Sequence, residues 1–190
     1  MNTMDISSGG NGVYVLSWNF TATDIVFKVE ARSTGWVGFG ISPNGGMSNS
    51  DMILAWTNSN GEVEFRDAHT DNSFIKSVTY DITQNWKKLF YLKANGKTTV
   101  IFTRKLKVCN PDQAPNEINI DIAPTQYVIY AYGDAFLSGT PTYHFSNRGS
   151  KSVPLLAALN QKITLNPSEI ETYDYMVDVN MKYLCELIFN

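Results

Sequence analysis

Short runs in which apolar and polar residues alternate recur along most of this chain, and they constrain its fold more than any other feature. In residues 24–31 the apolar side chains fall on one face and the charged side chains on the other. A period of two is typical of a half-buried β-strand. Turn signals separate such runs, since the pairs Asn60-Gly61 and Asn95-Gly96 supply the positive φ angles of tight hairpins. The chain therefore favours antiparallel strands.

Strand-like runs follow one another at close spacing, with almost no helical periodicity. We expect strands at residues 13–18, 24–31, 35–42, 52–56, 62–68, 74–80, 86–93, 98–103, 126–132 and 142–145. A long surface loop is expected at 109–124, weak helical character at 153–159, and a last strand-like run at 183–189 in an otherwise irregular carboxyl-terminal tail. Many short strands with turns between them predict an all-β fold, an antiparallel β-sandwich.

Length and charge narrow the function classes. A chain of 190 residues suits one all-β domain, or one domain with a tail. The net charge of -3 argues against a nucleic-acid partner, because such partners select basic surfaces. No apolar run approaches the roughly 20 residues of a membrane span, and residues 1–12 do not resemble a signal peptide. The triplet Asn19-Phe20-Thr21 is the one N-glycosylation sequon, which is weak evidence for secretion.

The stretch from Gly35 to Asp51 combines features of a binding site. Glycines alternate with apolar residues, which lets another backbone or a flat ligand approach closely. The loop that follows adds the thioether of Met47 and the carboxylate of Asp51, and both are candidate ligands. The two cysteines, Cys109 and Cys185, could pair with each other, pair with a partner elsewhere, or stay free.

Four segments together resemble the DOMON domain, above all that of dopamine β-hydroxylase and the DBH-like monooxygenases (the MOXD group). They are Gly35–Ser42, Ser50–Trp56, Asp67–Asp71 and Tyr143–Gly149. The resemblance covers residues 10–159, and it implies an immunoglobulin-like antiparallel β-sandwich there. Residues 160–190 resemble a linker and the start of a truncated copper type II monooxygenase region.

This resemblance implies a non-catalytic ligand-binding or interaction module from the amino-terminal part of a copper- and ascorbate-dependent monooxygenase. The parent would hydroxylate a catecholamine-like substrate, and its copper sites would need five histidines, whereas this chain has only His69 and His144. We therefore expect no catalysis from this chain alone, and copper only in a longer parent. The other domains of the parent would be its partners, any membrane association would come through the parent, and the location would be extracellular or the secretory lumen. The resemblance also implies partners outside this chain for Cys109 and Cys185.

An alternative function is electron transfer by haem b. Some DOMON domains, such as the cytochrome domain of cellobiose dehydrogenase, hold haem between a methionine and a histidine. Here Met47 lies in a Gly-rich loop and His144 comes late in the chain, in similar places. Thioether and imidazole ligands together give a six-coordinate iron suited to electron transfer. The plain interpretation is that Met47 covers apolar surface and His144 is a surface histidine.

A second candidate site takes a calcium ion or a similar cation. The resemblance implies a site formed by the Asp51 carboxylate, the backbone carbonyls of Met52 and Ala68, and the side chain of Asn85. Oxygen ligands of this kind suit calcium, although an amide brings no charge. The alternative donors are Asp67, Asp71 and Asp81. The plain interpretation is that Asp51 merely hydrogen-bonds its loop.

Overall fold

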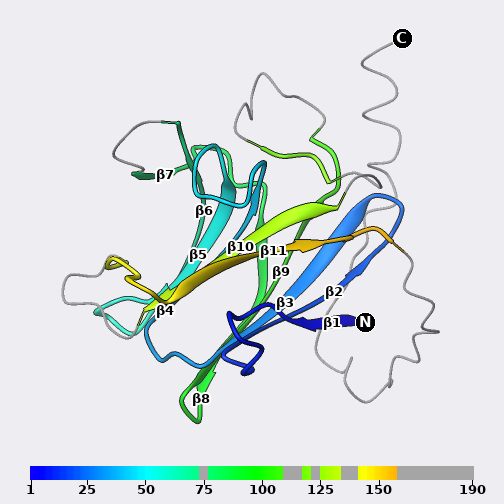
Figure 1. Cartoon of the computed structure of the whole chain (residues 1–190). Coiled ribbons are helices and arrows are strands. Elements are labelled where there is room, and N and C mark those ends of the chain that lie inside the picture. Colours follow the sequence, from blue (N-terminus) through cyan, green and yellow to red (C-terminus); the bar gives the residue numbers. More distant parts are fainter. Residues whose placement is uncertain (73–76, 109–116, 121–124, 134–140, 158–190) are drawn as a thin grey trace. The chain divides into compact units, whose positions relative to one another are not determined.

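The computed structural model describes residues 1–72, 77–108, 117–120, 125–133 and 141–157 (Figure 1). Every secondary-structure element in these residues is a strand. The described residues contain no helix that is long and apolar enough to cross a membrane. The strands are β1 (Asn2–Asp5), β2 (Tyr14–Phe20), β3 (Asp24–Ala31), β4 (Trp36–Ser42), β5 (Asp51–Thr57), β6 (Val63–Thr70), β7 (Val78–Tyr80), β8 (Lys87–Ala94), β9 (Lys97–Lys105), β10 (Gln126–Gly133) and β11 (Arg148–Val153).

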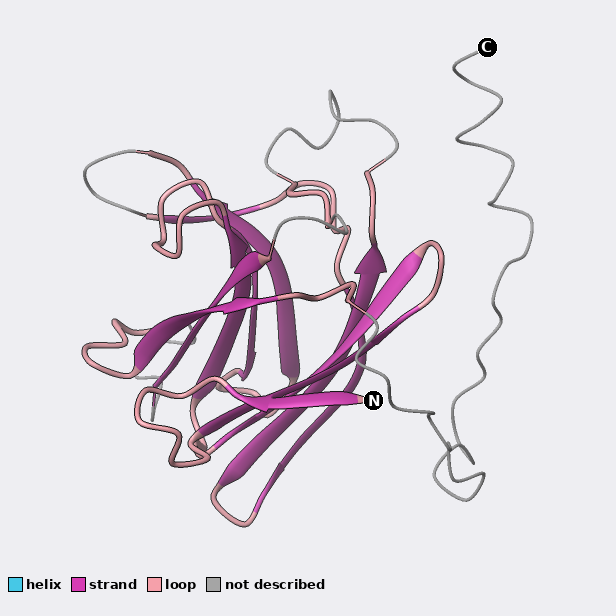
Figure 2. Ribbon diagram, turned by 45° about the vertical axis from the view of Figure 1, so that its right-hand side comes forward, coloured by secondary structure: helices cyan, strands magenta, loops and turns pink. Residues whose placement is uncertain are grey.

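The strands form two antiparallel sheets that face each other, as Figure 2 shows. The five-stranded sheet has the order β1-β2-β3-β9-β8, and the six-stranded sheet has the order β11-β10-β4-β5-β6-β7. The predicted all-β sandwich is therefore confirmed. The Asn95-Gly96 turn between β8 and β9 has positive φ at both residues, as predicted, whereas at the 60–61 turn only Gly61 does.

The main hydrophobic core lies between the sheets. Alternation in β3 places Phe27 in this core, where its ring lies 4.9 Å from that of Phe39 on β4 and 5.6 Å from that of Phe102 on β9. Trp86, just before β8, packs against the same rings. Burial of large aromatic side chains on this scale is the dominant stabilising contribution in a domain of this size.

The six-stranded sheet is also apolar on its outer face. A second cluster of buried side chains lies there: Trp36, Met52, Leu54, Trp56 and Ala68. These residues alternate with core residues along the strands, so that β4 is buried over its whole length. An antiparallel sheet with one solvated face would show polar residues at these positions. The outer face is therefore built to be covered.

The structure differs from the predicted strands at several places. Residues 142–145 form a loop that ends in a turn at Phe145, which has a φ of 48°, and the strand follows at β11. The sequence of β11 is almost entirely polar, because an edge strand with one exposed face needs no apolar alternation. Strand β1 was likewise not predicted. Residues 155–157 form a turn and not a helical segment, and the expected strand at 74–80 is described only as β7. The run 183–189, Cys109 and Cys185 lie outside the described residues.

Candidate functional site

A pocket of about 470 Å³ lies on the outer face of the six-stranded sheet. Its floor comes from β4, β5 and β10, and its walls come from the loop between β4 and β5 and from residues around the start of β11. Leu54, Ile129 and Ala131 give the floor its apolar character. The volume falls within the range typical of small-molecule sites.

Two glycines of β4 form part of the floor. Gly38 and Gly40 alternate with core residues, so their missing side chains would point outward into the pocket. A Cβ atom at Gly40 would lie 2.8 Å from the backbone oxygen of Asp51 and 2.8 Å from Cβ of Met52, which no side chain tolerates. At Gly38 it would lie 3.3 Å from the Trp36 ring. The predicted reason for these glycines, close approach of neighbouring groups, holds at this face.

Met47 and His144 both line this pocket. The backbone oxygen of Met47 accepts hydrogen bonds from the Thr70 hydroxyl and from the Ser50 N–H, at 3.2 Å in the latter case, which fixes the loop. His144 is buried, and its Nδ1 lies 3.1 Å from the backbone oxygen of Phe145. Nη1 of Arg148 lies 3.5 Å from the same Nδ1, so that this nitrogen has a carbonyl acceptor and a guanidinium donor as neighbours.

The protonation of His144 suits a ligand to a metal. Burial lowers the pKa of His144, and the positive charge of Arg148 lowers it further. The imidazole is therefore neutral at physiological pH, which is the form that binds a metal.

Trp36 lines the pocket with its indole ring, whereas its Nε1 is buried against Gly133, which does not line the pocket. The side chain of Trp36 is 3 % exposed, and its indole Nε1 has no hydrogen-bond partner among the described residues. A buried indole N–H normally finds an acceptor. The positions of the tryptophans in strand-like runs favour a role in the core. Trp36 lies instead in the outer apolar cluster and lines the pocket.

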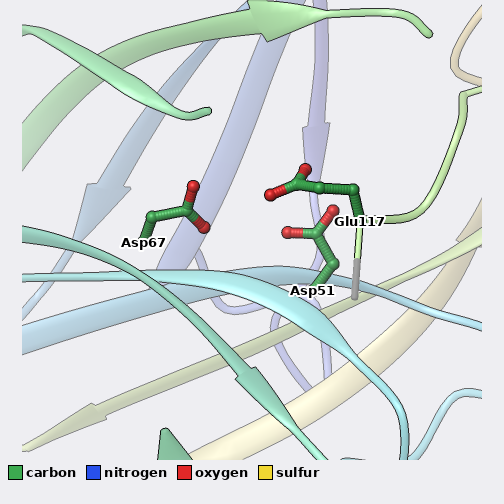
Figure 3. Close-up of side chains that lie close together, drawn as sticks. All are labelled: Asp51, Asp67 and Glu117. Carbon is green, nitrogen blue, oxygen red and sulfur yellow. The ribbon is translucent and has the colours of Figure 1, made fainter. Parts of the chain in front are cut away.

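A second cluster of functional groups lies between the sheets. The carboxylates of Asp51 on β5, Asp67 on β6 and Glu117 each offer an oxygen, and these three oxygens lie within 4.8 Å of one another. Figure 3 shows the three carboxylates converging. Arg104 on β9 forms ion pairs with Asp51 and with Glu117, the latter with Nη2 3.0 Å from Oε2. Three carboxylates and one guanidinium carry a net charge of -2 when all are ionised.

Asp51 is fully satisfied by hydrogen bonds. Its Oδ1 accepts the Trp86 indole N–H at 2.6 Å, and its Oδ2 accepts the Ile118 backbone N–H at 3.0 Å and an N–H of Arg104. The guanidinium of Arg104 also lies over the Trp86 ring, with Cζ 4.8 Å from the ring centre. Asp51 thus joins β5, β9 and residues 117–120, which is a larger structural role than the loop contact that the sequence suggests.

Asp67 is not fully satisfied. Its Oδ2 accepts the backbone N–H groups of Asn85 at 2.6 Å and Trp86 at 3.2 Å, but its buried Oδ1 has no partner among the described residues. Burial raises the pKa of Asp67 to about 8, and the charges of Glu117 and Asp51 add to the effect. Burial and the charge of Asp51 raise the pKa of Glu117 to about 7. The cluster therefore favours either bound protons or a bound cation near neutral pH.

The structure brings together only some of the predicted cation ligands. Asp51 is in the cluster, and Asn85 borders it, donating its side-chain N–H to Glu117 Oε1 at 3.0 Å. Met52 and Ala68 face each other across β5 and β6, with their side chains in the outer apolar cluster. Of the alternative donors, Asp67 joins the cluster, Asp81 Oδ1 lies 2.5 Å from His69 Nδ1, and Asp71 is exposed at the end of β6.

Glu117 and Arg104 were missed by sequence reasoning. Glu117 lies within 109–124, which has the composition of a surface loop. The available signal was the parity of β9: Phe102 points inward, so Arg104 must do so too, and a buried arginine requires acidic partners. The two histidines of the chain lie in different surroundings, with His69 beside Asp81 and His144 in the pocket. They therefore do not form a shared set of ligands.

Comparison with known proteins gives a consistent family. The model of the DOMON domain matches residues 10–133. DBH-like monooxygenase protein 1 of Gallus gallus is 29% identical over 185 residues, covering 94% of this chain and 28% of that protein. DBH-like monooxygenase protein 1 of Homo sapiens is 33% identical over 147 residues, covering 76% of this chain and 22% of that protein. DOMON domain-containing protein FRRS1L of Mus musculus is 25% identical over 131 residues, covering 69% of this chain and 42% of that protein. The chain thus spans less than half the length of these relatives.

Proposed function

The chain belongs to the DOMON domain family, and from this premise we propose that it is a non-catalytic ligand-binding module of a longer DBH-like monooxygenase. The pocket on the outer face of the six-stranded sheet carries the proposal. The monooxygenase activity that the names of the relatives print would belong to the parent, and the copper, the ascorbate and the catecholamine-like substrate are what the family resemblance implies for that parent. The other domains of that parent are the proposed partners.

The pocket has the properties of a site for a small, flat, apolar molecule. Its floor is apolar, its volume is about 470 Å³, and its lining includes the polar side chains of His144, Arg148 and Ser150. Sites of this kind combine an apolar lining with a few polar groups that orient the ligand. A ligand on the floor would cover the half-buried side chains of Ile129 and Ala131, and this would contribute roughly 25 cal/mol for each Å² of apolar surface removed from water.

Equilibrium titration with protoporphyrin IX, a flat probe with a large apolar ring and no iron, tests this proposal. Ile129→Trp should fill the pocket, because Ile129 is half-buried and lines it. Ile101→Trp is the matched control, since Ile101 is also half-buried but lies on the outer face of the five-stranded sheet. The proposal requires that the wild type and Ile101→Trp bind the probe and that Ile129→Trp does not. Equal binding by both variants would place the ligand elsewhere.

Haem b is the second candidate, favoured because Met47 and His144 line the same pocket. The residues fit the group: His144 offers a neutral imidazole and Met47 a thioether, and both line the pocket. Bound haem would supply one-electron transfer. In that case Met47 and His144 would be the axial ligands, and the apolar floor would exclude water from the ring.

We also propose a calcium ion or a similar cation at the carboxylate cluster. The unpartnered Oδ1 of Asp67 and the net charge of the cluster support it. Asp51, Asp67 and Glu117 would be the ligands, and a divalent ion would neutralise the cluster. Asn85 would then position Glu117 through its hydrogen bond. Such an ion would stabilise the packing of residues 117–120 against β5 and would have no catalytic part.

The proposed location is extracellular or the secretory lumen, through the parent. The sequon asparagine, Asn19, lies on β2 with its side chain half-buried. Expression behind a secretion signal in mammalian cells would test whether this domain is glycosylated in the secretory lumen. A glycosidase-sensitive band that is lost in Asn19→Gln would support glycosylation of this domain, and an unmodified secreted wild type would contradict it.

A further inference from the structure

We propose that the ligand of the outer-face pocket carries an anionic group, such as a carboxylate, which Arg148 binds at the edge of the pocket. This inference rests on the proposed ligand-binding function and specifies the chemistry of the ligand. It follows from the charge of the pocket lining and from the hydrogen bonds of a single side chain.

Arg148 is the one permanently charged residue among the described residues that line the pocket. The remainder of the described lining is glycine, aliphatic or aromatic, apart from Ser150 and the neutral His144, and the hydroxyl oxygen of Tyr130 accepts the Ser8 N–H at 2.9 Å. No acidic side chain in this part of the lining competes for the guanidinium. A single cation beside an apolar floor attracts a ligand with the opposite charge.

Arg148 has no acidic partner among the described residues. None of the ion pairs between described residues includes it. By contrast, Arg66 pairs with Glu64 and Arg104 pairs with Asp51 and Glu117. A guanidinium has five N–H donors arranged to match a carboxylate. Arg148 therefore retains donors for an anionic ligand.

Tyr143 holds Arg148 in place and adds a donor. Nη1 of Arg148 donates to the Tyr143 hydroxyl oxygen at 2.9 Å, which leaves the hydroxyl proton of Tyr143 free to donate. The Tyr143 ring stacks on His144, with ring centres 4.7 Å apart. The two donors are thus fixed beside the histidine of the pocket, and an anion there would receive hydrogen bonds from both.

The ligand is therefore an amphipathic molecule: a flat apolar body lies over the floor, and an anionic group meets Arg148. Hydrogen bonds to charged groups are stronger than those between neutral groups. A molecule with a free carboxylate should bind at least about tenfold more tightly than its neutral ester.

Binding of protoporphyrin IX, which has two carboxylates, should be compared with binding of its neutral dimethyl ester. The variants are Arg148→Gln and Arg148→Lys. Lys151→Gln is the matched control, because this substitution also removes one positive charge from β11, at a residue that is not in the pocket lining. The preference for the acid should disappear in Arg148→Gln, persist in part in Arg148→Lys, and remain in Lys151→Gln. It should also weaken at high salt, whereas binding of the ester should not.

Two results separate this inference from the pocket proposal. If the wild type binds the acid and the ester equally, or if Arg148→Gln keeps the preference, Arg148 does not bind an anionic group and the pocket proposal stands. If the wild type binds neither compound, the pocket proposal fails and this inference fails with it. Arg148 is exposed, so its substitution should leave the fold intact, and melting curves of the variants check this.

Discussion

Met47 and His144 come from loops far apart in the sequence, and both line one pocket on the outer face of the six-stranded sheet. The pairing of β10 between β4 and β11 brings their loops to the same face. The pocket thus follows from the order of the strands in the sheet, and each loop contributes only one of the two residues.

The spectrum of the protein purified with haem supplied tests the haem candidate. If Met47 and His144 are axial ligands, the wild type should show a Soret band that Met47→Ala and His144→Ala each abolish or convert to a high-spin form. Met52→Leu is the matched control, because Met52 is a second thioether in the pocket lining. A colourless wild type, or a band that the Met47 and His144 substitutions leave unchanged, would exclude this ligation.

Arg104 should contribute strongly to stability. Replacement by Met in EDTA would leave Asp51 and Glu117 buried without their cation, which should lower the free energy of unfolding by about 3–5 kcal/mol. Lys105→Met removes only the solvent-exposed pair with Asp24 and should cost under about 1 kcal/mol. Urea denaturation measures both, and equal losses would mean that the buried cluster is not held by Arg104.

Stability without a cation should fall as pH rises. The pKa of Asp67 is raised to about 8 and that of Glu117 to about 7, from ordinary values of 3.8 and 4.5. The folded state therefore binds more protons than the unfolded state from about pH 4 to pH 8, and the free energy of unfolding decreases through this window.

Asp67→Asn tests this assignment, because the amide cannot ionise. In EDTA the variant should lose part of the decline and should exceed the wild type at pH 8 by about 1 kcal/mol or more, since each pKa unit corresponds to about 1.4 kcal/mol. Urea denaturation at pH 5 and pH 8 gives the comparison. A decline of the same size in the variant would show that Asp67 is not its source.

Calcium should raise the melting temperature and should reduce this pH dependence by favouring the ionised carboxylates. At a hundredfold excess over the dissociation constant the gain is about 2.7 kcal/mol, or about 5–10 °C for a domain of this size. Asp51→Ala and Glu117→Gln should abolish the shift, whereas Asp24→Asn, which changes an exposed carboxylate, should retain it. No shift in the wild type would refute the cation site.

The sheets were predictable from sequence, because their information is local. Alternation in β3 and the turn at Asn95-Gly96 each depend on a few neighbouring residues. Strand β11 escaped prediction because it is held by register with β10, from Gln126 opposite Val153 to Ala131 opposite Arg148. Its own residues show no apolar face.

The candidate sites were predictable only in part. Residue chemistry and family resemblance pointed to Met47, His144 and Asp51. Glu117 could not be found in this way, because a carboxylate in an irregular segment looks solvated until the sandwich places Arg104 beside it. The position of Arg148 beside an apolar floor could not be predicted either, because that floor comes from β4, β5 and β10.

Backbone amide NMR with saturating protoporphyrin IX tests the central claim most directly, because it locates the ligand on the fold. The claim that the outer face of the six-stranded sheet is the binding site predicts shifts in β4, β5 and β10, including Gly38, Leu54 and Ile129. The β3 and β9 signals of the five-stranded sheet should remain unchanged. Shifts confined to the five-stranded sheet, or an unchanged spectrum, would contradict it.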